Sequence, residues 1–128
     1  MMHSSTVESK LYRFHNAFDK PTCYKYPGKH TVNKLKTLRI KLINEEYEEV
    51  IEAIEKGNPD EVLKELCDLV YVCVGFAVTY GWSFDTAFNR VHASNMSKLD
   101  EKGKSIYRED GKVSKSSTYT PPRLKDLV

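Results

Sequence analysis

An apolar run from Leu66 to Val78 is the feature that most constrains how this 128-residue chain can fold. Asp68 is the only charged residue within it. A helix that is apolar on all sides must be covered on all sides, as at the centre of a bundle or at a subunit interface. A chain of this length forms one compact domain but has little material to surround such a helix. We therefore expect a homodimer or a homotetramer.

Helical periodicity also marks two helices before this run. The first follows Ser5, which with Glu8 resembles a capping box, and continues to about Phe18. The second is expected to begin at Thr31, as its cap, and to run to about Lys56. Both predicted helices carry an apolar stripe that needs a packing partner.

The connection Gly57-Asn58-Pro59 combines a helix stop with a helix start. It predicts a third helix from Pro59 to about Tyr80, and a fourth is expected from Ser83 to about Leu99. The sequence thus predicts an all-α, four-helix-bundle-like domain over residues 1–99. An irregular C-terminal tail over residues 100–128 should pack on the same or a neighbouring subunit.

No stretch of the sequence reaches the roughly 20 apolar residues that span a bilayer, and the N-terminus lacks the apolar core of a signal peptide. We therefore expect a cytoplasmic protein with no membrane partner. The lysine-rich flanks lack the interleaved aromatic residues of a single-strand binding surface, so we expect no nucleic acid partner either.

Charge is segregated along the chain although the formal net charge is only +2. Residues 44–68 hold ten acidic residues and two lysines, whereas both flanking segments are basic. Such a centre suits a metal site whose anionic ligand is also met by cations. A solvated acidic helix face is the ordinary alternative.

Two of these acids lie where apolar residues belong. On a helical wheel of the second predicted helix, Glu46 and Glu49 fall within the apolar stripe, while Glu48 and Glu52 fall on the opposite side. An unpartnered buried carboxylate costs several kcal/mol. The residues of the stripe are Leu35, Leu38, Leu42, Val50 and Ala53.

The third predicted helix repeats the anomaly with Glu65 and Asp68, which are i, i+3 neighbours. Helices joined by a short connection are antiparallel neighbours, so both acidic pairs should face one cavity. Because all the donors are hard oxygens, Mg²⁺ or Mn²⁺ is the expected ion. The alternative is that the acids pair with buried cations, for which Arg39 on the same stripe is the first candidate.

On the fourth predicted helix, Asn95 lies on the apolar stripe and Lys98 lies one turn further along. An amide and an ammonium at the mouth of a metal cavity suit a base, a sugar or a phosphate. Lys98 is equally well explained as an ordinary cation at a helix C-terminus.

These motifs resemble those of the all-α NTP pyrophosphohydrolases, a superfamily that includes MazG-like enzymes, dimeric dUTPases and phosphoribosyl-ATP pyrophosphohydrolases. The paired acids Glu46-x-x-Glu49 and Glu65-x-x-Asp68, separated by 15 residues, carry the resemblance. It extends to Phe14-His15 near the start, to the segment from Val91 to Leu99, and to Asp110-Gly-Lys-Val113 and Pro121-Pro122 in the tail.

The resemblance implies a MazG-type fold in which Glu46, Glu49, Glu65 and Asp68 hold Mg²⁺. It also implies that Asn95 and Lys98 contact a nucleotide, and we add Arg39 as a substrate-binding candidate. The reaction would cleave a (d)NTP between the α- and β-phosphates and release pyrophosphate, with dUTP-like substrates as a first guess. One carboxylate would take the proton of the attacking water; Glu46 is the first candidate and Glu49 the second. The alternatives are a phosphoribosyl-ATP pyrophosphohydrolase and a non-catalytic, nucleotide-binding dimerisation module.

Overall fold

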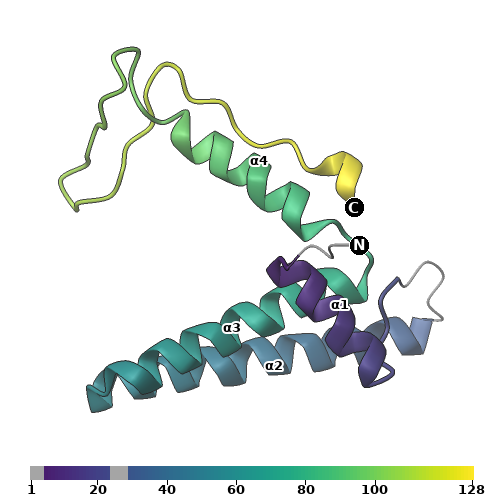
Figure 1. The fold of residues 1–128 in the computed structure, drawn as a ribbon. Helices are drawn as coiled ribbons and strands as arrows, with labels where there is room; N and C mark the ends of the chain where they lie inside the picture. Colours follow the sequence, from purple (N-terminus) through teal and green to yellow (C-terminus); the bar gives the residue numbers. More distant parts are fainter. Residues whose placement is uncertain (1–4, 24–28) are drawn as a thin grey trace. The chain divides into compact units, whose positions relative to one another are not determined.

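The computed structural model of the protein describes residues 5–23 and 29–128. The regular secondary-structure elements in these residues are all helices. The α-helices are α1 (Val7–Ala17), α2 (Lys29–Lys56), α3 (Pro59–Thr79) and α4 (Phe84–Met96), and a short 3-10 helix, η1 (Lys125–Leu127), lies near the C-terminus (Figure 1). The all-α prediction is confirmed. Within the described ranges, no helix is long and apolar enough to cross a membrane.

The chain forms two compact units, Met1–Ser83 and Phe84–Val128. The first contains α1, α2 and α3, and the second contains α4, the tail and η1. In the first unit, α2 lies alongside α3, and α1 packs on α3 (Figure 1).

The turn between α2 and α3 sets the geometry of the first unit. Gly57 has a φ of 77°, a conformation that glycine adopts without strain, and its N–H donates to the carbonyl oxygen of Ala53 at 3.1 Å. Asn58 is the N-cap of α3 and Pro59 follows at its first turn. The chain therefore reverses within a few residues, and α2 and α3 run antiparallel, as predicted.

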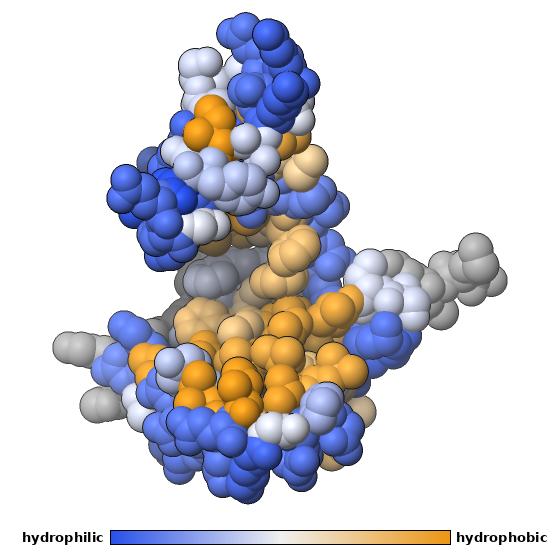
Figure 2. Space-filling model, turned by 90° about the vertical axis from the view of Figure 1, so that its left-hand side faces the viewer, coloured by the Kyte–Doolittle hydropathy of each residue, from blue (hydrophilic) through white to orange (hydrophobic). Residues whose placement is uncertain are grey.

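The core of the first unit is built from residues of α1, α2 and α3. Its buried apolar residues are Leu11, Val50, Ala53, Val74, Ala77 and Val78. Earlier in α3, Leu63, Leu66 and Val70 are exposed. The single chain thus buries only part of the apolar run, and Figure 2 shows hydrophobic surface over the first unit.

Two of the predicted helix starts need correction. Thr6, and not Ser5, is the N-cap of α1, and its hydroxyl accepts from the backbone N–H of Ser9 at 3.1 Å. The helix α2 begins at Lys29, so Thr31 lies inside it and does not cap it. Ser5 and Thr6 are both good capping residues, and the N-cap is the one whose backbone is extended directly before the first helical residue, which here is Thr6.

A buried polar cluster joins the three helices of the first unit. Arg39 on α2 is 8% exposed and donates from Nη2 to the carbonyl oxygen of Val72 at 2.8 Å. His15 on α1 is 2% exposed, and its Nδ1 lies 2.8 Å from the carbonyl oxygen of Pro21. Gly75 on α3 leaves room for both, since a Cβ there would collide with the Arg39 guanidinium and lie 3.3 Å from His15 Nε2.

In the second unit the tail returns along α4 (Figure 1). Asp126 accepts from both Nη atoms of Arg90, at 2.6 and 3.1 Å, and Ser94 donates its hydroxyl to the carbonyl oxygen of Thr120 at 2.7 Å. These contacts hold a tail that has almost no regular secondary structure of its own.

Candidate metal centre

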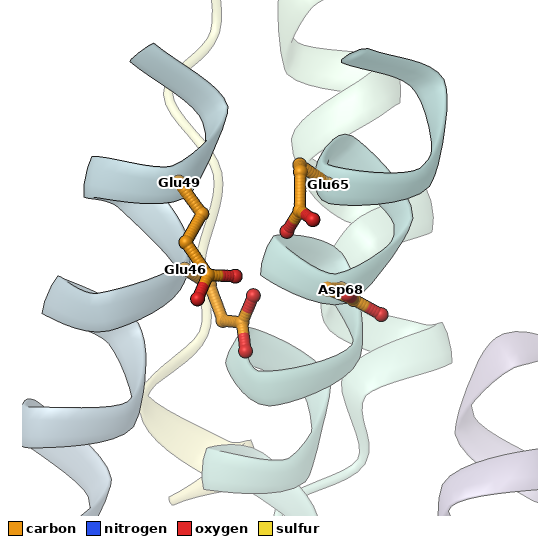
Figure 3. Close-up of side chains that lie close together, drawn as sticks. All are labelled: Glu46, Glu49, Glu65 and Asp68. Carbon is orange, nitrogen blue, oxygen red and sulfur yellow. The ribbon is translucent and has the colours of Figure 1, made fainter. Parts of the chain in front are cut away.

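The first unit brings the four predicted carboxylates together. Glu46 and Glu49 project from α2 toward Glu65 on α3, and Asp68 lies one turn further along α3 (Figure 3). Each residue contributes a carboxylate oxygen, and these atoms all lie within 4.8 Å of one another. The i, i+3 spacing within each helix and the antiparallel pairing produce this arrangement.

Two oxygens in this cluster are buried without a partner. Glu46 Oε2 and Glu65 Oε2 have no hydrogen-bond donor, and the Glu65 side chain is only 15% exposed. A buried acceptor that lacks a donor is costly, and more so when it carries charge. The two oxygens therefore fit a bound cation, whose coordination would satisfy both.

Glu49 shows the crowding of negative charge most clearly. Hydrogen bonding to Glu65 and repulsion by Glu46 raise the pKa of Glu49 to about 7. The carboxyl group is exposed, so the neighbouring acids cause the shift and burial contributes little. In the absence of metal, the cluster relieves its repulsion partly by holding a proton.

Lys64 brings a positive charge next to the carboxylate cluster. Its Nζ lies 2.7 Å from Asp68 Oδ2 and 3.2 Å from Glu65 Oε1. Hydrogen bonding to Asp68, and then to Glu65, raises the pKa of Lys64. This ammonium meets the α3 side of the cluster and leaves Glu46 Oε2 without a partner.

A cavity of about 400 Å³ continues from the carboxylate cluster toward the α2–α3 turn. Two members of the cluster, Glu49 and Glu65, belong to its lining, and so do two lysines, Lys56 and Lys64. Its remaining lining residues are Glu52, Ala53, Asp60 and Glu61. A cavity lined by lysines and by two acids of a candidate metal site suits a polyphosphate bound through a cation.

The candidate metal ligands all belong to one chemical class. All four residues offer carboxylate oxygens, and no histidine or cysteine belongs to the cluster among the residues the structure describes. Hard oxygen donors of this kind suit Mg²⁺ or Mn²⁺.

The remaining predicted site residues lie elsewhere. The guanidinium of Arg39 is held by the Val72 carbonyl oxygen, and within residues 5–23 and 29–128 no ion pair joins it to a carboxylate. Asn95 lies in α4 and is exposed, and Lys98 follows the end of that helix. Both belong to the second unit, and their contact with a nucleotide stays a prediction.

Sequence patterns did not single out Lys64, although a signal was present. A lysine four residues before Asp68 lies on the same side of a helix as that carboxylate. A count of charges gives Lys64 only as one of two lysines in an acidic segment and does not indicate which carboxylates it contacts.

Comparison with known proteins agrees with this geometry. A family model described as "Phosphoribosyl-ATP pyrophosphohydrolase" matches residues 11–95, which include all four carboxylates. No curated protein matches the chain.

Proposed function

Because the chain belongs to the phosphoribosyl-ATP pyrophosphohydrolase family, we propose that it cleaves a nucleotide between the α- and β-phosphates in a Mg²⁺-dependent reaction. Pyrophosphate and a nucleoside monophosphate derivative would be the products. The family match makes phosphoribosyl-ATP the first substrate to test, and a (d)NTP such as dUTP the second. Both substrates contain the same phosphoric anhydride bond.

The observation that supports this proposal best is the pair of buried carboxylate oxygens without donors. Glu46 Oε2 and Glu65 Oε2 lack partners in a cluster whose ligand atoms lie within 4.8 Å of one another. Glu46, Glu49, Glu65 and Asp68 would hold Mg²⁺, or Mn²⁺ in its place. When bound, such an ion neutralises phosphate oxygens and lowers the pKa of a coordinated water.

The carboxylates also supply a proton acceptor. Of the two candidates, Glu46 has a buried oxygen, whereas Glu49 is exposed, so water can reach its carboxylate. A general base must lie within reach of the water whose proton it takes. We therefore favour Glu49 as the group that takes the proton of the attacking water, with Glu46 fixing its position.

Asn95 and Lys98 are the residues proposed to contact the nucleotide. Asn95 would bind the base or sugar and Lys98 a phosphate, through an amide and an ammonium that suit those groups. Arg39 is left out of this set, because its guanidinium is buried against α3. Its role in the proposal is to join the helices that carry the carboxylates.

A substrate panel tests the proposed activity. Phosphoribosyl-ATP and the common nucleoside triphosphates are assayed for pyrophosphate release with Mg²⁺ and with Mn²⁺. We expect Glu49→Gln and Asp68→Asn to lower kcat/KM at least about a hundredfold, as losses of single electrostatic groups at active sites do. Glu48→Gln is the matched control, because this exposed residue of α2 lies outside both the cluster and the cavity.

Two outcomes would contradict the proposal. Unchanged turnover in both cluster variants would exclude the four carboxylates as the active site. No pyrophosphate from any nucleotide, together with a melting temperature that millimolar Mg²⁺ does not change, would favour the non-catalytic binding module.

We also propose that the protein is a homodimer or homotetramer. Exposed apolar residues recur on one side of α2 at helical spacing, namely Ile40, Tyr47, Ile51 and Ile54. A contiguous apolar face of this kind on a soluble domain marks an interaction surface. Light scattering after size exclusion should show the larger species for the wild type and for Glu48→Gln, and the monomer for Ile51→Glu.

A further inference from the structure

Lys64 both pairs with the carboxylate cluster and lines the adjoining cavity. Its ammonium pairs with Asp68 and Glu65, at 2.7 and 3.2 Å, and its side chain also lines the cavity that extends toward the α2–α3 turn. The side chain is 65% exposed, so it can rotate without disturbing the core. A long flexible stem allows the ammonium to reach either place.

The second lysine of the cavity has a different partner. Lys56 Nζ lies 3.1 Å from Glu52 Oε1, one turn before it on α2, and Glu52 is outside the carboxylate cluster. In the described part of the chain, Lys64 is therefore the only lysine paired with a member of the cluster. A divalent ion and the Lys64 ammonium would compete for the negative charge of the same two carboxylates, Glu65 and Asp68.

We propose that Lys64 is a tethered counter-ion of the metal centre that gives way to the divalent ion and then binds phosphate oxygens in the adjoining cavity. The inference rests on the proposed function, because it requires a metal at the four carboxylates. In the metal-free protein the ammonium neutralises Glu65 and Asp68. Once released it faces a cavity that also includes Glu49 and Glu65, where the polyphosphate of a metal-bound substrate would lie.

The charge of the cavity explains why a released lysine is useful there. Five of its eight lining residues are acidic, namely Glu49, Glu52, Asp60, Glu61 and Glu65, so an incoming polyphosphate meets repulsion wherever metal does not shield it. Lys56 is held by Glu52, which leaves Lys64 as the cation that metal binding sets free. Metal binding and phosphate binding would thus be coupled through one side chain.

The test measures Mn²⁺ binding directly, by the electron paramagnetic resonance signal of free Mn²⁺, in the full-length protein. The variants are Lys64→Met, which removes the charge but keeps the stem, and Lys64→Arg, which keeps the charge. Lys56→Met is the matched control from the same cavity. Methionine and arginine are both good helix formers, so α3 should remain folded, and circular dichroism checks this.

Removal of the competing charge should tighten Mn²⁺ binding by Lys64→Met roughly two- to fivefold, as expected for the loss of an exposed ion pair. Lys64→Arg and Lys56→Met should bind Mn²⁺ like the wild type. With Mn²⁺ bound, Lys64→Met should bind inorganic pyrophosphate several-fold more weakly than the wild type does. Tighter Mn²⁺ binding together with weaker pyrophosphate binding is the result expected if Lys64 leaves the carboxylates when the metal binds and then contacts phosphate.

Failures of the two proposals can be told apart. If the wild type binds Mn²⁺ and Glu49→Gln weakens that binding, but Lys64→Met binds Mn²⁺ and pyrophosphate as the wild type does, the role of Lys64 is wrong and the metal centre stands. Weaker Mn²⁺ binding by Lys64→Met would also overturn it, because the lysine would then support the metal. Absence of Mn²⁺ binding in the wild type would overturn both proposals.

Discussion

Replacing Glu65 with Gln should stabilise the metal-free protein and reduce its response to metal. Glu65 lies between α2 and α3 with one oxygen buried and unpartnered, and three further carboxylates contribute oxygens within 4.8 Å. Glutamine has the same shape and no charge. The substitution therefore isolates the electrostatic strain that a bound cation would relieve.

The expected magnitude follows from the distances. Two unit charges 4.8 Å apart repel by about 0.9 kcal/mol in water and by about 3.5 kcal/mol at an effective dielectric constant of about 20. Even at the lower value, removing the repulsion of Glu65 by Glu46 and Asp68 outweighs the loss of its exposed pair with Lys64, which contributes at most about 1 kcal/mol. A net gain of about 1 kcal/mol should raise the melting temperature by about 3 to 6 °C.

A bound metal ion should stabilise the wild type more than it stabilises Glu65→Gln. At a metal concentration of about 100 times the Kd, the wild type gains about 2.7 kcal/mol, whereas a variant that binds tenfold more weakly gains about 1.4 kcal/mol. The metal-induced rise in melting temperature should therefore be clearly smaller in Glu65→Gln than in the wild type. The exposed Glu52→Gln, outside the cluster, should behave like the wild type with and without metal.

Thermal unfolding followed by circular dichroism, first with a chelator and then with Mg²⁺ or Mn²⁺, measures both effects. A lower melting temperature for Glu65→Gln in chelator would show that the carboxylates do not repel one another in the folded protein. An equal gain with metal in variant and wild type would show that Glu65 does not ligate the ion. Either result would refute the reasoning from the buried oxygens.

Further predictions concern pH and packing. The pKa of Glu49 is raised from 4.5 to about 7 in the folded protein. Between pH 4.5 and about 7 the folded state therefore binds more protons at this carboxyl group than the unfolded state does. Glu49 should thus make the metal-free protein less stable as the pH rises through this range. Burial lowers the pKa of His15, so titration of His15 changes the stability with pH in the opposite direction. The test is therefore the difference in melting temperature between wild type and Glu49→Gln, measured in chelator from pH 4.5 to 8. A difference that does not depend on pH would contradict the prediction. Gly75→Ala should cost about 1 to 2 kcal/mol in urea unfolding, because overpacking against Arg39 exceeds the helix propensity that alanine adds, and a stabilised variant would contradict the close packing. Deleting residues 100–128 should raise KM if the tail contributes phosphate contacts, and an unchanged KM would assign the tail to packing on α4 alone.

The positions of the four carboxylates could be predicted from the sequence because helical periodicity is a local property. Glu46 and Glu49 interrupt an apolar stripe, and Asp68 is the lone charge in an apolar run. The short Gly57-Asn58-Pro59 connection allows only an antiparallel return, so the two pairs had to approach each other. Glu65 followed mainly from its spacing to Asp68 and from the family resemblance.

Partners of buried polar groups were not predictable in this way. Arg39 lies on the same stripe as the acids, which made a buried ion pair with them the alternative to a metal site. In the structure its guanidinium instead binds the Val72 carbonyl oxygen in space left by Gly75. Contacts of this kind depend on which residues of a second helix lie opposite, and that register is not encoded in either helix alone.

The apolar run from Leu66 to Val78 shows the same division. Its composition alone indicated a helix that needs cover on every side. Only the tertiary structure decided which half is covered within the chain: Val74 and Val78 are buried, whereas Leu66 and Val70 stay exposed. The tertiary structure likewise decided that Lys64 meets Glu65 and Asp68, since a flexible ammonium goes to the strongest negative field, and that field arises only when two helices bring their carboxylates together.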